Sequence, residues 1–268
     1  MEIIEQFDHW NERYTAWKQK QRHGADELAG YPVVKNARAP FTPARRALSM
    51  MQVALISSAG AYIDGTDPFD TGTPDGDLDC REIPSEIELR DLRFSPRGYD
   101  SAFVQQDPNV QVPLARLFEF ELNRIIGQVN SVFWSFSGFI PSAGRFVNKM
   151  IPKLLERLHR YDVQSVLLIP ASRLCHQSCA LTARGIEQTG IPTMMLAVER
   201  EVSESVRPPR IAYYAGQFGS VAGQANWPEH QRRILDEALR WLEPMGEPGI
   251  KKLVVELESK VEAARGER

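Results

Sequence analysis

Two of the three cysteines of this 268-residue chain lie together, in the stretch SRLCHQSC from Ser172 to Cys179. The preceding run VLLIP, residues 166–170, is apolar enough for a strand that a parallel sheet buries on both faces. Ser172 is a suitable N-cap for a helix over residues 173–189, which a glycine then ends. Cys175 would lie in the first turn of that helix, where unpaired N–H groups and the helix dipole favour the thiolate. Cys175 is therefore the first candidate for nucleophilic chemistry.

Cys179 follows one helical turn after Cys175, so both thiols are expected on the same helix face. The spacing is C-x-x-x-C and not the redox motif C-x-x-C, which makes a direct disulfide geometrically awkward. Cys179 is thus predicted to be a resolving or assisting thiol. The alternative is structural, because buried cysteines often pack as small apolar side chains.

A zinc site is the second reading of the same stretch. Zinc prefers tetrahedral nitrogen and sulfur ligands, and Cys80 in space beside Cys175, His176 and Cys179 would supply four. The close C-x-x-C pairs of common zinc sites are absent. No sequence motif identifies any other cofactor, so the sequence predicts either a site without a cofactor or this zinc alternative.

The elements that must position these residues alternate between strand and helix. Predicted strands cover residues 53–58, 131–135, 166–170, 193–198 and 211–214, with a short irregular strand over 87–94; predicted helices cover 2–22, 112–128, 146–160, 173–189, 229–242 and 250–264. This order predicts an α/β fold whose largely parallel sheet carries helices on both faces. The aromatic stripe of the first helix indicates docking on the body or, alternatively, a contact between copies in a homo-oligomer.

In such a sheet, the loops at the carboxyl ends of the strands gather into a ligand crevice. The predicted substrate-binding residues are the polar or small ones in these loops, together with one aspartate and one arginine: Ser57, Ser58, Gly60, Asp67, Ser135, Ser137, His176 and Arg210. Arg210 is included because arginine binds carboxylates bidentately. Asp67 belongs to an aspartate-rich loop over residues 62–79, which is more typical of solvated turns than of a cation site.

The composition is ordinary for a globular protein, with 43% hydrophobic and 25% charged residues and a net charge of −3. This charge gives no reason to expect nucleic acid or an anionic membrane as a partner. No signal peptide and no apolar run of membrane-spanning length is visible. Three cysteines without a framework spacing suit a reducing compartment, so a cytoplasmic location is expected.

Several motifs together resemble the selenoprotein B component of glycine, sarcosine and betaine reductase and the related D-proline reductase subunit. The matching pieces are DPFD (67–70), CREIP (80–84), GYD (98–100), DPNVQVPLARL (107–117), LLIPASRLC (167–175), IEQTGIPT (186–193) and the PPR…G…G pattern of 208–223. The similarity, which rests on the order and spacing of these pieces, covers residues 50 to 242. The predicted organisation is an N-terminal helix and arm (1–45), an α/β reductase-like domain (46–245) and a C-terminal helix (246–268).

The resemblance implies reductive cleavage of a C–N bond, with a partner subunit that carries a pyruvoyl group and a carrier protein. It also implies a selenocysteine three residues before the cysteine that corresponds to Cys175. Ser172 occupies that position here. A serine hydroxyl forms neither a selenoether nor a selenyl-sulfide, so the resemblance supports the fold and the location of the site better than the reaction.

The leading hypothesis is a thiol-dependent reductase-like enzyme for a small amino-acid-like substrate, with C–N or C–S bond chemistry. Its predicted catalytic residues are Cys175, Cys179 and Ser172. A thiol electron donor or a partner subunit would supply the electrons. The alternatives are a zinc or small-molecule binding protein that uses the same cysteines, and a partner subunit whose chemistry has been altered.

Overall fold

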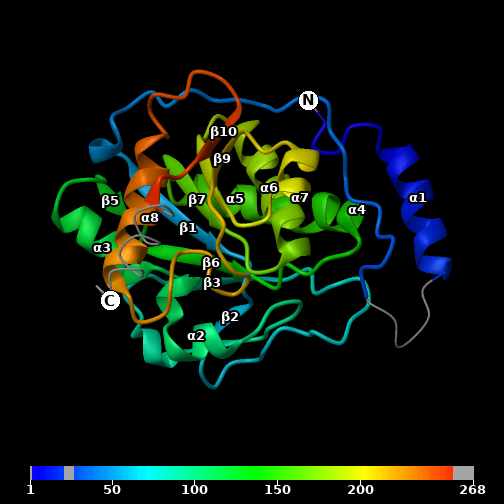
Figure 1. Ribbon diagram of the computed structural model, residues 1–268, viewed down its shortest axis with the longest axis horizontal. Helices are drawn as coiled ribbons and strands as arrows, with labels where there is room; N and C mark the ends of the chain where they lie inside the picture. Colours follow the sequence, from blue (N-terminus) through cyan, green and yellow to red (C-terminus); the bar gives the residue numbers. More distant parts are fainter. Residues whose placement is uncertain (1, 21–26, 256–268) are drawn as a thin grey trace.

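The computed structural model describes residues 2–20 and 27–255 and contains one large twisted sheet with helices on both faces (Figure 1). The strands are β1 (Gln52–Ser57), β2 (Ala61–Ile63), β3 (Cys80–Pro84), β4 (Leu92–Phe94), β5 (Gln128–Val129), β6 (Val132–Phe136), β7 (Ser165–Ile169), β8 (Thr193–Ala197), β9 (Arg210–Tyr213) and β10 (Gly249–Lys252). The helices are α1 (Phe7–Lys20), α2 (Ala102–Gln106), α3 (Leu114–Leu122), α4 (Ala143–Arg145), α5 (Ile151–Arg160), α6 (Arg173–Glu187), α7 (Arg200–Val206) and α8 (Pro228–Arg240).

The large sheet has the strand order β10-β9-β8-β7-β1-β6-β3, with β5 pairing with β1. The pairs from β10 to β6 are parallel, and β3 joins β6 as an antiparallel edge strand. The predicted α/β class with a largely parallel sheet is confirmed. β2 and β4 form a separate antiparallel ribbon, and β2 lies below β3 in the view of Figure 1.

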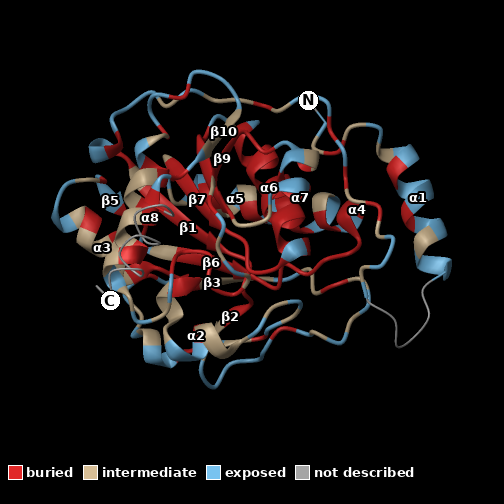
Figure 2. Cartoon of the chain, in the orientation of Figure 1, coloured by how far each residue is buried: buried red, intermediate tan, exposed pale blue. Residues whose placement is uncertain are grey.

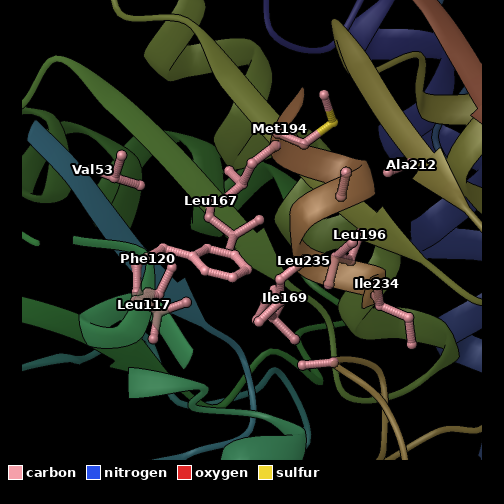
Figure 3. Packing of buried hydrophobic residues seen from close by; sticks show 14 of the residues in the cluster. Val53, Leu117, Phe120, Leu167, Ile169, Met194, Leu196, Ala212, Ile234 and Leu235 are labelled. Atoms are coloured by element: carbon pink, nitrogen blue, oxygen red, sulfur yellow. The ribbon is translucent and has the colours of Figure 1, made fainter. Parts of the chain in front are cut away.

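Successive residues of the central strands enter different cores. Val53 and Leu55 of β1 join the cluster that α3 and α8 cover, whereas Ala54 and Ile56 join the cluster beneath α1, α5, α6 and α7. Figure 3 shows the first cluster, in which side chains of β7 and β8 meet Phe120 of α3 and residues of α8. The central strands are buried throughout (Figure 2), as an apolar run without polar alternation predicts.

The N-terminal segment packs on the body of the same chain, so the docking interpretation of its aromatic stripe is confirmed. Trp10 and Tyr14 are buried, and the Trp10 indole donates to the carbonyl of Pro32. The arm that follows lies along α6, where the backbone N–H of Val34 donates to the Gln177 side chain. The helix is shorter than predicted, starting at Phe7 instead of residue 2.

The predicted helix over residues 146–160 is divided in a way that its proline explains. Phe146–Met150 forms one π turn and α5 begins at Ile151, which places Pro152 in the first turn of α5. Proline has no N–H to donate into a preceding turn, and a widened turn before it avoids the clash with the upstream carbonyl. The helix therefore continues past Pro152.

The structure corrects the predicted local structure near residues 80–94 and 250–252. Residues 89–91 form a 3-10 turn, so only Leu92–Phe94 of the predicted strand 87–94 is extended, and the unpredicted CREIP segment is the edge strand β3. Residues 250–252 belong to β10 where a helix was expected, because backbone pairing with β9 extends the sheet after a proline and a glycine. The rest of that predicted helix, from residue 256, lies outside the described residues. The division of the chain into three segments stays a prediction.

Candidate functional site

The cysteine-bearing helix α6 starts at the point where the order of the strands in the sheet reverses. β1 and β7 are parallel neighbours, but the chain continues from β1 towards β6 and from β7 towards β8. Their exit loops consequently diverge, and ligands bind at such a point in open α/β sheets. Ser58 follows β1 and Ser172 follows β7, so both lie at this switch point.

Ser172 caps α6 and contacts the sulfur of Cys175. Its Oγ accepts from the Cys175 backbone N–H at 3.3 Å, and its hydroxyl donates to Cys175 Sγ at 3.0 Å. The N-cap conformation is extended, as a capping serine requires. The position predicted for the N-cap and the first-turn thiol is therefore the observed one.

The other groups around Cys175 Sγ come mainly from strand exits. The Ser58 carbonyl lies 3.7 Å from the sulfur, and a Cβ added to Gly138 would lie 2.9 Å from it. Tyr99, from the segment after β4, packs against the small cluster of Ala59, Ala171 and Cys175. These contacts leave Cys175 only 1% exposed, so in this conformation the thiol is closed off from solvent.

His176 is fully buried and holds two strand exits together. Its Nδ1 lies 2.7 Å from the Ser172 carbonyl, and its Nε2 accepts from the backbone N–H groups of Val198 and Glu199 at 3.1 and 3.3 Å. Because Nε2 accepts, the ring is neutral and carries its proton on Nδ1. Burial lowers the pKa of His176 to about 4, which agrees with a neutral ring. Both ring nitrogens are thus used internally, and His176 has none left for a substrate.

Cys179 lies deeper on the same helix and is fully buried. Burial, followed by the nearby Cys175, raises the pKa of the Cys179 thiol well above its usual value, and the Ser58 side chain offsets part of this shift. Cys179 is consequently a poorer nucleophile than a first-turn thiol. Its predicted resolving or assisting role requires local opening of the helix start.

Four further predicted residues lie at the carboxyl ends of β1 and β6 or just after them, and the hydroxyls of Ser57 and Ser135 are used by the protein itself. Ser135 Oγ accepts from the N–H of Ala61 at 2.7 Å, and Ser57 Oγ faces the N–H of Ala59 at 3.4 Å. Ser137 forms an isolated bridge with Ala59. Gly60 has a φ of 70°, and its Cβ would lie 2.8 Å from a backbone oxygen, which explains the glycine. These residues shape the loops.

Three predicted residues are not brought to Cys175. Arg210 is the first residue of β9, so it lies at the amino end of that strand and away from the strand exits. There it forms a buried ion pair with Glu187 at 2.6 Å. Asp67 lies exposed in its loop. Cys80 lies on β3 opposite Phe136, and burial raises the pKa of its thiol to about 12. Among residues 2–20 and 27–255, no group of three His, Cys, Asp or Glu side chains is arranged to hold a metal, so the zinc set is not assembled.

Two residues near Cys175, Gly138 and Tyr99, were not among the predicted site residues. Gly138 carried a signal, because it follows a strand exit in the motif SFSGF and a side chain there would collide with Ser58 and Cys175. Tyr99 belongs to the GYD motif, but its docking depends on how a loop after β4 folds back over β1. Local sequence does not encode that contact.

Comparison with known proteins identifies the class to which this fold and site belong. The sequence profile described as glycine/sarcosine/betaine reductase selenoprotein B matches residues 20–171, which is more than half of the chain. The chain belongs to this family, as the motifs predict. The matched region ends one residue before Ser172, and no solved structure matches the chain.

The relatives include subunits of reductase complexes. The D-proline reductase subunit gamma of Acetoanaerobium sticklandii is 29% identical over 75% of this chain and 82% of its own length. The sarcosine reductase complex component B subunit beta of Peptoclostridium acidaminophilum is 30% identical over 76% of this chain. The glycine reductase complex component B subunit gamma of Symbiobacterium thermophilum is 24% identical over 76% of this chain. The chain spans about half the length of the last two, 48% in each case.

Within residues 2–20 and 27–255, none of the helices combines the length and apolar character needed to cross a membrane.

Proposed function

We propose that this chain is the thiol-bearing subunit of a cytoplasmic reductase complex that acts on a small amino-acid-like substrate, with Cys175 as the nucleophile. One observation carries the proposal. Cys175 lies in the first turn of α6, at the switch point of the sheet, and its sulfur receives a hydrogen bond of 3.0 Å from Ser172. A hydroxyl that donates to sulfur stabilises negative charge there. Membership of a family of amino-acid reductase subunits supplies the reaction class.

The serine at position 172 shifts the nucleophilic role to Cys175. The resemblance places a selenocysteine at residue 172, but a serine hydroxyl is a weak nucleophile without an adjacent base. His176 does not serve as that base, because both its nitrogens are bonded to the backbone. Ser172 therefore acts as the cap of α6 and as a hydrogen-bond donor to the sulfur, while the thiol forms the covalent bond.

The proposed reaction has two thiol steps. The Cys175 thiolate attacks the carbon that bears the amine, so a C–S bond forms and the C–N bond breaks; the amine leaves with the bonding pair and takes up a proton. A second thiol then attacks the Cys175 sulfur, a disulfide forms, and the carbon leaves with the electron pair and is protonated. Two thiols are oxidised to a disulfide while a C–N bond becomes a C–H bond.

The second thiol is proposed to come from a carrier protein or another dithiol donor, with Cys179 assisting. Cys179 is fully buried and its thiol pKa is raised, which makes it the less suitable direct donor. A partner subunit is part of the proposal, because the relatives are named as subunits of multi-component reductases. By the resemblance, a pyruvoyl group on that partner would activate the amine.

The test is turnover by the complex isolated through a tag on this chain. Dithiothreitol serves as reductant, and glycine, sarcosine, betaine and both hands of proline are the substrates. The Cys175→Ala variant is expected to lose activity by about 1,000-fold or more, whereas Cys179→Ala retains a measurable fraction. Full turnover by the Cys175→Ala complex would refute Cys175 as the nucleophile.

A second candidate is a subunit that has lost the chemistry and serves assembly. Two observations favour it: Ser172 replaces the residue that the resemblance expects, and Cys175 is 1% exposed. In that case the isolated complex turns over equally with and without Cys175. The same assay therefore decides between the two candidates.

A further inference from the structure

Three groups beside the sulfur of Cys175 belong to strand exits and to the N-cap of α6. These three are the Ser172 hydroxyl at 3.0 Å, the Ser58 carbonyl at 3.7 Å and the backbone of Gly138. Each is fixed by backbone bonds, such as the 3.0 Å bond from the Gly138 N–H to the Ser58 carbonyl. Tyr99, on a surface segment, packs against the cluster of Ala59, Ala171 and Cys175. Of these four residues, Ser172, Ser58, Gly138 and Tyr99, only Tyr99 is partly exposed, so we expect a ligand to reach the sulfur from its side.

The segment that carries Tyr99, residues 95–100, is held mainly by side chains. Within the described part of the chain, residues 96–100 make no backbone–backbone hydrogen bond, although Ser95 before them donates to Gly60. The Tyr99 phenol donates to the carbonyl of Ala59 at 2.6 Å. The Arg97 guanidinium stacks on Phe139 at 4.5 Å and donates to a backbone carbonyl. Segments held this way open at a lower free-energy cost than strands of the sheet.

The residues on either side of this segment line a groove on the surface. Phe94 before the segment and Ser101 after it contribute to a groove of about 530 Å³, whose wall also includes Tyr62 and Arg90. Phe94 packs in addition against the cluster that contains Cys175. An outward movement of the segment would thus connect this groove with the sulfur.

We propose that Tyr99 is the gate of the site: in the closed state its ring seals Cys175 and its hydroxyl occupies the Ala59 carbonyl. In the open state the thiol is reachable from the groove, and the Ala59 carbonyl is free to accept a hydrogen bond from a ligand N–H. The gate itself is independent of turnover. Only the statement that the ligand N–H belongs to an amine substrate rests on the proposed function.

A substitution at Gly98 is a second, independent way to perturb the gate. Its φ is 77°, and an added Cβ would lie 2.6 Å from the Phe139 ring and 3.2 Å from Ser172 Cβ. A side chain at this position is strained in the backbone and collides with the floor of the gate. The Gly98→Ala variant is therefore expected to favour the open state without changing Tyr99 or Cys175.

The experiment measures iodoacetamide labelling of each cysteine by peptide mass spectrometry under native conditions. Tyr99→Phe keeps the ring but loses one hydrogen bond, and labelling of Cys175 is expected to rise about fivefold. Tyr99→Ala removes the cover and is expected to raise it by a larger factor, with Gly98→Ala between the two. Cys179 and Cys80 in the same molecules report general loosening and are expected to keep their wild-type rates.

The matched control is Tyr31→Phe, which also removes a phenol bonded to a backbone carbonyl, that of Pro141 at 2.9 Å. Tyr31 contacts α6 through Gln177 and not through Cys175. Unchanged labelling of Cys175 in Tyr99→Phe and Gly98→Ala would overturn the proposal, as would a parallel rise at all three cysteines. Loss of turnover plays no part in this readout, so the gate and the proposed nucleophile are refuted by different results.

Discussion

A polar cluster is buried at each end of α6. The two clusters differ in how far their own hydrogen bonds leave polar groups available to a ligand. At the carboxyl end, the Glu187 carboxylate accepts from Arg210 at 2.6 Å, from the N–H and hydroxyl of Thr193 and from the N–H of Thr42. At the amino end, the Cys175 thiol contacts a hydroxyl and a carbonyl beside an aromatic ring from a surface segment. The first cluster is closed on itself, and the second is closed by Tyr99.

This difference shows that burial and charge alone do not identify a site. Glu187 and Arg210 are the more polar pair, and burial raises the pKa of the Glu187 carboxyl while the Arg210 charge opposes that shift. They nevertheless lie at the amino ends of the strands, opposite the strand exits. Their bonds join α6 to β9 and to the N-terminal arm. The cluster at the amino end has the position at the strand exits and the proposed movable cover that ligand binding needs.

The largest expected effect separates the clusters by stability. Arg210→Met leaves the Glu187 carboxylate buried without its partner, and we expect the free energy of unfolding to fall by about 3–5 kcal/mol. Urea unfolding followed by circular dichroism at pH 7.5 measures this loss. The rate of Cys175 labelling in the folded protein is expected to stay at the wild-type value, because the two clusters do not share a contact.

Arg160→Met is the matched control, since Arg160 forms an exposed ion pair with Glu156 at 3.1 Å on α5. Exposed pairs of this spacing contribute only about 0.3–0.5 kcal/mol. The double variant Arg210→Met/Glu187→Gln removes the unpaired charge and is expected to recover part of the loss. A loss below about 1 kcal/mol in Arg210→Met would show that the pair does not anchor α6.

The next effect is a pH dependence that arises from His176 at the amino end of α6. The folded protein binds a proton at His176 only near pH 4, because burial lowers its pKa to about 4, whereas the unfolded chain binds it near the ordinary histidine pKa of 6.5. The contribution of His176 is therefore complete above pH 6.5 and is lost as the pH falls from 6.5 to 4. Over this window we expect a loss of about 3 kcal/mol in the free energy of unfolding.

His176→Gln keeps an amide donor and acceptor but has no proton to bind in this range, so its unfolding free energy is expected to fall less between pH 7 and pH 4. The quantity to measure is the difference between the two pH profiles, in which the common carboxylate contributions cancel. His159→Gln on the exposed side of α5 is the control for loss of a histidine. Identical profiles for wild type and His176→Gln would contradict a buried neutral ring.

The amino-end cluster was largely predictable because its signals are local. An apolar run, a serine and a cysteine in the first turn define β7, the cap and the thiol, and the structure places each within one or two residues of its predicted position. The α/β class follows from the alternation of strands and helices. Both inferences need only the periodicity and capping rules of neighbouring residues.

The carboxyl-end cluster and the gate were not predictable, because they depend on contacts between distant segments. Arg210 was predicted to bind substrate because of its residue type. Its position is instead set by the register of β9 on β8, which places it at the amino ends of the strands. Tyr99 lies against the cluster of Ala59, Ala171 and Cys175 after the ribbon of β2 and β4 has turned the chain back towards β1. Residue type carries no information about either arrangement.

The smallest expected effect concerns the hydroxyl that distinguishes this chain at residue 172. Ser172→Ala removes the cap bond to the Cys175 N–H, which is expected to lower the free energy of unfolding by about 1 kcal/mol. It also removes the hydrogen bond to the sulfur, and we expect Cys175 to react several-fold more slowly with iodoacetamide at pH 7 in the open background of Tyr99→Ala. Ser172→Thr retains the hydroxyl and is expected to restore both values. If Ser172→Ala loses stability but reacts at the same rate, the hydroxyl is a cap alone, and the amino end of α6 then resembles the carboxyl end in being purely structural.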